Sequence, residues 1–485
     1  MSKQFEKINI TKKSENISEW YLDVVKHADL ADYSDVKGCM IIKPSGYAIW
    51  EFVQKTLDNW FKDDGVQNVY FPIFIPMSLL EKEKAHVAGF SPELAVVTHA
   101  GGEDLAEPLA VRPTSETIMY KTFSDWIQSY RQLPFKVNQW ANVVRWEKRT
   151  YPFLRTSEFL WQEGHTVHRT SEDAVNMMMK ALAWYKKFYE EYFSISVYAG
   201  KKSQSEKFAG AKDTFSIELV MPDGKALQAA TSHDLSDNFS KVFEVQFLDE
   251  DGDKKNAFQT SWGLSTRAIG GLILTHGDDA GLIVPPKVSQ YQVVIVGVSP
   301  GDEEIEKNVS NFVTEISDIL RKNGIRVTID LNFKHSLGYR INEWELRGVP
   351  LRLEIGNREI KENKIAFARR DTFEKGNFGK DELAEKVNLI LNNIQANLFE
   401  KSDKIKKDLT AEVSNYEEFK SVISNGKSFI RAFWCEDPSC ENKIKEETKA
   451  SSRVLELDQM NKTESGKCFH CGDKASHRWL FAQSY

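Results

Sequence analysis

The spacing of hydrophobic and polar residues changes along the chain, and the first pattern extends to about residue 285. Within it, short apolar segments such as Asn68–Pro72 and Ala141–Val144 read as strands that recur between helices without regular strand–helix alternation. Ser171–Phe193 reads as one long helix, with Thr170 or Ser171 as its N-cap. The pattern predicts an α+β region built on a mixed, mainly antiparallel sheet with flanking helices.

A different pattern begins after Pro285 and Pro286 and is typical of a small α/β domain. The strand Gln292–Val298 precedes a helix whose apolar residues recur every three or four positions, and Gly324 ends that helix. Ile325–Ile329 reads as the next strand, which completes a βαβ unit. Further strands are predicted at Leu351–Ile355 and Ile365–Ala368, and a closing helix at Leu383–Leu398.

The rest of the chain is polar and carries most of the cysteines. Lys401–Asp408 (KSDKIKKD) reads as a charged linker to a small C-terminal region. A chain of 485 residues is too long for one core, so several domains are expected. We predict domains at residues 1–286, 287–402 and 403–485.

The composition is that of an ordinary globular protein, with 41% hydrophobic and 12% aromatic residues. The N-terminus is polar and no apolar run approaches the length of a membrane span, so we expect a soluble, cytoplasmic protein without a cleaved signal or a membrane partner. The net charge of -7 means that any nucleic-acid contact depends on local basic surface.

Four of the five cysteines form two pairs near the C-terminus, Cys435 with Cys440 and Cys468 with Cys471. The odd count and the absence of a signal argue against a disulfide framework. Four clustered thiolates favour a structural, tetrahedral Zn²⁺ with no open catalytic position. The alternative is a set of reduced thiols without metal.

The segment from Arg145 to Phe159 predicts a hairpin that gathers two arginines, a carboxylate and an aromatic ring. Arg145-Trp146-Glu147 lies on an expected strand, and Arg155 and Phe159 follow a polar loop on the returning strand. Arginine binds phosphate, glutamate accepts hydrogen bonds and a ring stacks under a base, so such a hairpin is able to hold a nucleotide. The simpler explanation is a twisted hairpin with surface salt bridges.

Other polar segments each have a functional and a simpler explanation. Thr114 and Glu116 offer a hydroxyl and a carboxylate for an ammonium group, or they cap a helix. On a strand, alternate residues of the segment Trp161–His165 share a face that suits a small zwitterion, although a core tryptophan is the commoner case for an isolated segment. The small, polar segment Gln228–His233 is interpreted either as part of the lining of a nucleotide cleft or as an ordinary turn. Arg267, before an apolar helix at Ala268–Thr275, binds an outer phosphate or pairs with an acid.

In this order the segments resemble one family over nearly the whole chain, the class II prolyl-tRNA synthetases of the archaeal and eukaryotic type. The hairpin resembles motif 2 of the class, and Phe71–Pro76 resembles motif 1, whose proline lies at the family's dimer interface. Other supporting stretches are Ala31–Ser34, Gly38–Met40, Lys43–Glu51, Arg112–Glu116, Phe153–His165 and Ser261–Arg267. Thr266 departs from the class pattern, because a glutamate often precedes the motif 3 arginine.

The resemblance implies a role for each matching position. Arg145 and Arg267 would be the catalytic arginines. The proline site would use Thr114, Glu116, Arg145, Trp161, Glu163, His165, Phe90, Phe208, His233 and Ser261. The ATP site would use Arg145, Glu147, Arg155, Thr156, Phe159, Gln228, Thr231, Ser265 and Arg267. Glu345, Arg352 and Glu354 would read the anticodon.

The resemblance also implies the reaction and its partners. The three predicted domains would be catalytic, anticodon-binding and zinc-binding, in a homodimer that joins L-proline to tRNA(Pro) with ATP and Mg²⁺. Only about 60 residues separate His165 from Gln228, so no large editing domain fits between motifs 2 and 3. Two alternatives stay open: another class IIa synthetase, such as threonyl or glycyl, and a non-catalytic RNA-binding paralogue. The first is disfavoured by the segment Trp161–His165 and the second by the presence of Glu116, Arg145 and Arg267.

Overall fold

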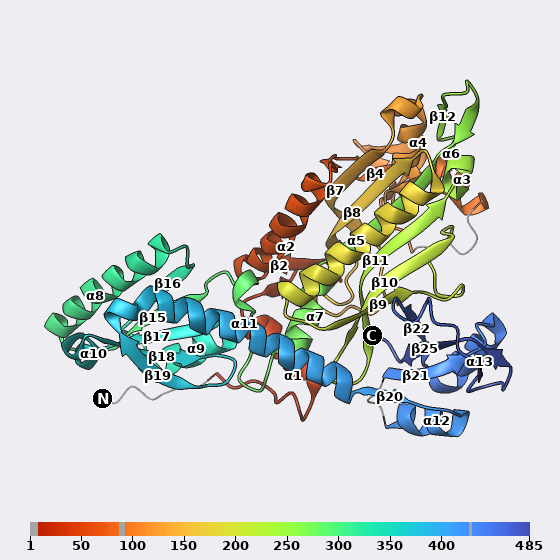
Figure 1. The fold of residues 1–485 in the computed structure, drawn as a ribbon. Helices are drawn as coiled ribbons and strands as arrows, with labels where there is room; N and C mark the ends of the chain where they lie inside the picture. Colours follow the sequence, from red (N-terminus) through yellow and green to blue (C-terminus); the bar gives the residue numbers. More distant parts are fainter. Residues whose placement is uncertain (1–7, 87–92, 426–428) are drawn as a thin grey trace.

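An antiparallel sheet of eleven strands runs through the centre of the molecule (Figure 1). The structure, a computed structural model, describes residues 8–86, 93–425 and 429–485. Only the short outer pairs β3–β7 and β20–β21 are parallel, so the predicted mixed, mainly antiparallel sheet is confirmed. In spatial order the strands are β20 (Thr410–Glu412), β21 (Phe429–Trp434), β25 (His477–Ala482), β22 (Ser451–Glu456), β9 (Val197–Lys201), β10 (Asp213–Val220), β11 (Ala226–Ser236), β14 (Phe258–Ser265), β8 (Glu158–His168), β7 (Phe135–Val144) and β3 (Gln67–Asn68).

Helix α5 (Ser171–Glu191) lies along one face of this sheet and supplies much of the core. Its N-cap is Thr170, as predicted, and its buried side chains include Tyr185 and Tyr189. They join Trp20, Trp50 and Trp262 in the largest hydrophobic cluster. The other helices of this region are α1 (Ile17–His27), α2 (Pro44–Asp63), α3 (Met77–His86), α4 (Glu116–Trp126), α6 (Asn238–Phe243) and α7 (Arg267–His276), with 3-10 turns η1 (Tyr130–Gln132) and η2 (Pro286–Val288).

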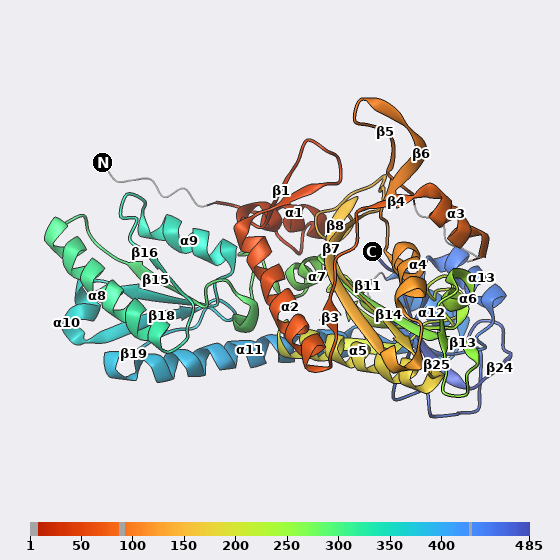
Figure 2. The ribbon, with the colours of Figure 1, turned by 90° about the horizontal axis from the view of Figure 1, so that it is seen from above.

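Three small sheets project from this core. One contains β4 (Phe74–Pro76), β6 (Glu103–Val111) and β5 (Val96–Ala100), and forms the hairpin that stands out in Figure 2. The others pair β1 (Ala31–Tyr33) with β2 (Met40–Ile42) and β12 (Gln246–Leu248) with β13 (Lys254–Asn256). The predicted strand Asn68–Pro72 is mostly wrong, because β3 ends at Asn68. Beyond it the Gln139 side chain accepts from Phe71 N at 2.5 Å, and Pro72 has no N–H to donate.

The predicted βαβ unit is confirmed as a separate five-stranded sheet at one end of the molecule. Strand β15 lies between β16 and β17 and pairs in parallel with both. The buried positions of α8 include Val309, Val313 and Ile316, at the predicted helical spacing. The elements are β15 (Val293–Gly297), α8 (Glu303–Lys322), β16 (Val327–Asp330), α9 (Leu337–Arg347), β17 (Leu351–Ile355), α10 (Asn357–Glu362), β18 (Lys364–Arg369), β19 (Lys375–Gly379), η3 (Lys380–Glu382) and α11 (Leu383–Asp408).

The predicted linker Lys401–Asp408 is wrong, because these residues are the last two turns of α11. The charges lie along an amphipathic helix: Lys407 pairs with Asp403, while Ser402 is buried and accepts a hydrogen bond from Ser196 N at 3.0 Å. In Figure 1, α11 extends from the five-stranded sheet past the central region to β20. The helix thus continues through the predicted boundary at residues 402–403, and the domain limits themselves stay a prediction.

The C-terminal region is joined to the central sheet through strand pairing. Leu455 and Glu456 of β22 pair with Lys201 and Gly200 of β9. A Cβ at Gly200 would lie 2.2 Å from the carbonyl oxygen of Leu455, so this close approach requires glycine. The remaining elements are α12 (Tyr416–Ser424), α13 (Pro438–Thr448), β23 (Gly466–Lys467) and β24 (Lys474–Ala475). No helix in the described ranges is long and apolar enough to cross a membrane.

Candidate active site

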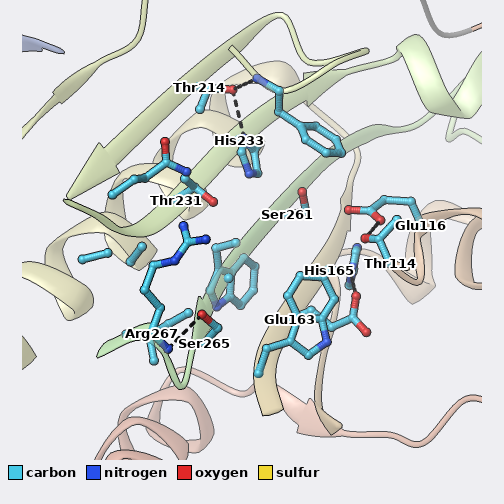
Figure 3. A pocket seen from close by; sticks show the side chains of 18 of the residues that line it. Thr114, Glu116, Glu163, His165, Thr214, Thr231, His233, Ser261, Ser265 and Arg267 are labelled. Atoms are coloured by element: carbon cyan, nitrogen blue, oxygen red, sulfur yellow. Dashed lines mark hydrogen bonds and ion pairs between the residues drawn. The ribbon is translucent and has the colours of Figure 1, made fainter. Parts of the chain in front are cut away.

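A polar cavity of about 250 Å³ opens over strands β8, β11 and β14 (Figure 3). It collects most of the predicted site residues. From the proline set, its walls contain Thr114, Glu116, Arg145, Trp161, Glu163, His165, Phe208, His233 and Ser261. From the ATP set they contain Arg145, Phe159, Gln228, Thr231, Ser265 and Arg267. Phe90 lies outside the described residues.

Strand alternation on β8 brings one set of side chains into the cavity. Trp161, Glu163 and His165 all line it, as the period of two predicts. The opposite face meets the core: Gln162 contacts the Tyr185 hydroxyl of α5, and a Cβ at Gly164 would lie 2.0 Å from the Trp262 indole. A core role for Trp161, the commoner case for an isolated segment, is therefore wrong.

Glu163 and His165 belong to a buried hydrogen-bond network. Glu163 Oε1 accepts from Ser115 Oγ at 2.5 Å and from Gln139 Nε2 at 2.8 Å. His165 Nε2 lies 3.2 Å from Glu163 Oε2, and its Nδ1 lies 2.9 Å from the Tyr120 hydroxyl. No sequence motif indicated any of these three partners, Ser115, Gln139 and Tyr120. Gln139 sits directly opposite Glu163 in the β7–β8 register, so a correct hairpin register would have found it.

Thr114 and Glu116 form a compact hydroxyl–carboxylate pair at the same end of the cavity. The Thr114 hydroxyl donates to the Glu116 carboxylate, and both side chains are buried. Helix α4 begins at Glu116, with Ser115 as its N-cap and without a side-chain capping bond. The cap explanation is therefore wrong for Thr114, and the pair faces the cavity instead. A hydroxyl and an anion so placed can bind an ammonium group.

Two arginines face the cavity from different elements. Arg145 immediately follows β7, which ends at Val144, and its Nε donates to Pro113 O at 2.9 Å. Its guanidinium carbon lies 5.5 Å from the Phe159 ring centre and 5.4 Å from that of Trp161. The Arg145 side chain is exposed to the cavity, but the protein around it excludes solvent and lowers its pKa. The negative charge of Glu116 partly offsets this decrease. The guanidinium stays charged at neutral pH.

Arg267 is the first residue of α7 and points toward the opposite end of the cavity from Glu116 (Figure 3). Its Nε donates to Leu154 O at 3.0 Å, and its backbone N–H donates to Ser265 Oγ at 3.3 Å. Burial, and then the charge of Arg145, lower its pKa. Within the described residues Arg267 forms no ion pair with an acid, so its charge is available to an anionic ligand.

Three predicted ATP residues do not line the cavity. Arg155 is exposed and its Nε lies 2.7 Å from Glu147 Oε2, as in the simpler surface-pair explanation. Thr156 is buried. Their roles stay a prediction.

The remaining wall combines strand β11 with the loop before β10. The predicted turn at Gln228–His233 is wrong, because these residues lie within β11 and pair on both sides. His233 Nδ1 lies 2.9 Å from the Thr214 hydroxyl, and the Phe208 ring centre is 4.7 Å from that of His233. Thr214, Glu206 and Lys207 also line the wall and were missed, since no motif marks them.

Buried histidines are expected to make the fold sensitive to acid. Burial lowers the pKa of His233 to about 3 and those of His168 and His276 to about 4. An unfolded histidine titrates at about pH 6.5, so between there and about pH 4 the unfolded chain binds more protons than the folded one, and the free energy of unfolding decreases as the pH is lowered. Thermal unfolding should occur several degrees lower at about pH 5 than at pH 7. His276→Asn should shrink this difference; an unchanged difference would contradict the assignment.

The four predicted metal-ligating cysteines come together in the C-terminal region. Their Sγ atoms all lie within 4.8 Å of one another. Cys440 and Cys468 Sγ are 3.8 Å apart, and Cys435 and Cys471 Sγ are 3.6 Å apart. A tetrahedral Zn²⁺ with bonds of about 2.3 Å requires thiolates roughly 3.8 Å apart. The donor set therefore fits zinc, and His470 Nδ1 lies 3.2 Å from Cys440 Sγ as a further neighbour.

The three predicted anticodon residues contact one another in the five-stranded domain. Arg352 is buried; its Nη1 donates to Glu345 and its Nε to Glu354, each at 2.9 Å. They are not the solvated alternating charges of the simpler explanation. Glu345 and Arg352 share a small surface hollow with Arg369 and Arg370. The geometry thus offers a pre-formed polar cluster.

Comparison with known proteins covers nearly the whole chain. Residues 98–276 match the tRNA synthetase class II core domain (G, H, P, S and T), residues 292–389 an anticodon binding domain, and residues 416–485 the C-terminal domain of prolyl-tRNA synthetase. A proline–tRNA ligase of Chlorobium limicola is 50% identical over 98% of this chain and 99% of its own length. One from Borreliella burgdorferi is 47% identical, with the same coverage.

A solved structure is similar over the same extent. The crystal structure of prolyl-tRNA synthetase from Cryptosporidium parvum, complexed with halofuginone and AMPPNP, has a TM-score of 0.94 and 44% sequence identity. The match covers 98% of this chain and 99% of that one.

Proposed function

This chain belongs to the class II prolyl-tRNA synthetases and is a proline–tRNA ligase, and we propose that the cavity over β8, β11 and β14 performs its first step. There L-proline and ATP form prolyl-adenylate and pyrophosphate. The prolyl group then passes to the 3′ end of tRNA(Pro).

The observation that carries this proposal is the separation of charge in the cavity, with acidic side chains at one end and an arginine at the other. One end gathers Thr114, Glu116 and Glu163, which suit the cationic amine of proline, with the Trp161 ring beside them. The other end contains Arg267, which suits the phosphates of ATP. Arg145 lies against Trp161 and Phe159, where its charge interacts both with Glu116 and Glu163 and with Arg267. A small amino acid and a nucleotide would therefore meet beside Arg145.

The chemistry needs no protein nucleophile or base. The carboxylate of proline is already ionised, and one of its oxygens attacks the α-phosphorus while pyrophosphate leaves. Arg145 would hold both the carboxylate and the α-phosphate, and stabilise the negative charge that builds between them. Arg267 would bind the outer phosphates. The network around Glu163 and His165 would fix the amine, since every buried member has a partner.

Mg²⁺ is proposed to accompany ATP, neutralising phosphate charge. Among the described residues, the cysteine cluster alone gathers three or more metal-ligating side chains, so the cavity has no protein cage for this ion. That fits Mg²⁺, which is commonly held by phosphates, water and one or two carboxylates. Glu206 is a carboxylate in the wall. We also propose that the four cysteines hold a structural Zn²⁺, which would fix the local fold and take no part in the reaction.

Pyrophosphate exchange with a panel of amino acids tests the proposed reaction. Proline should support exchange of label between pyrophosphate and ATP, whereas threonine and glycine should not. Exchange with threonine or glycine alone would favour another synthetase of the class. Exchange with none of them would favour a non-catalytic, RNA-binding role.

The archaeal and eukaryotic type is proposed for this chain, although the similar proteins from Chlorobium and Borreliella are bacterial. Support comes from the region between motifs 2 and 3. Helix α5 and strands β9 and β10 fill the chain between β8 and β11, as integral parts of the central sheet region. No large editing domain is inserted among these described residues. Any hydrolysis of mischarged tRNA would then require a separate protein.

The polar cluster around Arg352 is proposed to recognise the anticodon. Arg352→Ala should lower kcat/KM for tRNA in aminoacylation by about 10- to 100-fold, because it releases the two carboxylates that Arg352 positions, and one specific base contact contributes roughly 1–3 kcal/mol. Proline-dependent pyrophosphate exchange, which needs no anticodon, should change less than twofold. An equal loss in both assays would instead indicate damage to the fold.

A cytoplasmic homodimer is proposed as the working form. Exposed aromatic residues include Phe74 in the predicted motif 1, Tyr70 immediately before it, and Tyr33 of β1. Burying such residues against a second copy would stabilise a dimer. Sedimentation velocity would distinguish a dimer from the monomer, which has a mass of 55.6 kDa.

A further inference from the structure

The loop between β9 and β10 forms one wall of the candidate active site. Glu206, Lys207 and Phe208 line the cavity from this loop. Its distal part is fixed to the central sheet, because Phe208 N donates to Thr214 Oγ1 at 2.9 Å. Thr214 in turn contacts His233. The loop therefore brings Phe208 against His233 at the proposed proline end.

The first half of the same loop is held by helix α13 of the C-terminal region. Ser203 Oγ donates to Glu441 Oε1 at 3.2 Å, and Lys445 Nζ lies 2.8 Å from Glu206 Oε1. Ser203 Oγ also accepts from Glu206 N at 3.2 Å, so the two anchored residues support each other. Glu441 and Lys445 are one helical turn apart, on the side of α13 that faces the loop.

Burial makes this contact more than a surface pairing. Ser203 and Glu441 are both buried, and Ser452 of β22 donates to the same carboxylate oxygen. At the first position of the loop, buried Lys202 lies 3.2 Å from Glu218 Oε1 of β10, and Arg453 of β22 donates to Glu218 Oε2 at 2.8 Å. The C-terminal region thus supplies partners for two loop positions, Ser203 and Glu206, and for Glu218 of β10, which in turn pairs with Lys202.

We propose that Glu441 and Lys445 are positioning residues for the proline site. They touch neither substrate; they hold Ser203 and Glu206 so that Phe208 closes the cavity against His233. This inference rests on the proposed function of the cavity. The C-terminal region would then take part in amino-acid binding and would also carry the cysteine cluster. The two features are adjacent, because Cys440 of the cluster directly precedes Glu441.

The position of the loop predicts which substrate is affected. In Figure 3 the side chains of Thr214 and His233 lie on the side of the cavity away from Arg267 and Ser265. Phe208 lies on the same side, because its ring packs against His233. Weakening the anchor should therefore raise KM for proline more than KM for ATP. A general loss of stability would raise both or lower the amount of active protein.

The double variant Ser203→Ala/Lys445→Met tests the proposal with small changes that leave the buried Glu441 in place. The two hydrogen bonds of the Ser203 hydroxyl and one partly exposed ion pair are lost, so KM for proline in pyrophosphate exchange should rise about tenfold, with KM for ATP within twofold. Hydrogen–deuterium exchange of peptides covering the loop should become faster. Glu447→Gln is the matched control, because Glu447 lies on the same helix but pairs with Tyr416; it should match the wild type.

The outcomes separate this proposal from the proposed function. A double variant with unchanged KM for proline, an equal rise in both KM values, or unchanged loop exchange would overturn the positioning role. Wild-type protein without any proline-dependent exchange would overturn the proposed function instead. Lys445→Arg on its own keeps the charge and should retain wild-type KM.

Discussion

Replacement of Arg145 by alanine is expected to slow proline-dependent adenylate formation by about 10²–10³-fold. The side chain lies between the proposed proline and ATP ends, so its charge would act on the bond that forms between carboxylate and phosphorus. Losing one such donor from a pre-organised site costs roughly 3–4 kcal/mol of transition-state stabilisation. Pre-steady-state measurement of adenylate formation at saturating proline and ATP would report this step.

The loss should concern the reaction and not the fold. Arg145 has one hydrogen bond from its Nε, to Pro113 O, and its side chain is exposed to the cavity, so the unfolding temperature should change little. Arg145→Lys should recover only part of the rate, because lysine lacks the planar fork that spans two anions. Arg169→Ala is the control, since Arg169 pairs with Asp249 and Glu250 outside the cavity. An Arg145→Ala rate within threefold of the wild type would refute the assignment.

Loss of one cluster cysteine is expected to destabilise the C-terminal region severely. The four thiols connect the start of α13 with the segment around β23 and β24. Structural zinc in small peptides contributes an apparent ~10–16 kcal/mol of binding free energy, and that energy stabilises the folded form. Cys440→Ser should therefore abolish stoichiometric zinc and lower the unfolding temperature of this region by many degrees. Elemental analysis and calorimetry would measure the two effects.

Cys39 supplies the matched control for this experiment. It lies far from the cluster in sequence and is not one of its members, so Cys39→Ser should keep one zinc per chain and the wild-type unfolding profile. If purified protein contains no zinc and Cys440→Ser unfolds like the wild type, the cysteines are reduced thiols, as in the alternative explanation.

Local periodicity was enough to predict the parts of the site that lie on one strand. Trp161, Glu163 and His165 share a face of β8 because strand geometry has a period of two. The α/β domain could be predicted for a similar reason, since the apolar spacing of α8 matches its buried face. Both depend on residues close together in sequence.

What could not be predicted depends on register and on distant contacts. Gln139 reaches Glu163 only because of the β7–β8 pairing, and Tyr120 reaches His165 from a helix. The charged end of α11 looked like a linker, but Ser402 has a partner, Ser196, more than 200 residues away. The contact between Glu441 and Ser203 likewise spans 238 residues. No local pattern encodes such pairings, since each requires the folded core to bring the partners together.

A crystal structure with a non-hydrolysable prolyl-adenylate analogue would show whether one cavity holds both substrates with Arg145 at their junction. The pyrrolidine nitrogen should lie within hydrogen-bond distance of Thr114 and Glu116, the pyrrolidine ring beside Trp161, and the phosphate mimic against Arg145. The adenosine should extend toward Phe159. An analogue bound in this cavity without contacting Arg145, or bound elsewhere, would contradict this arrangement.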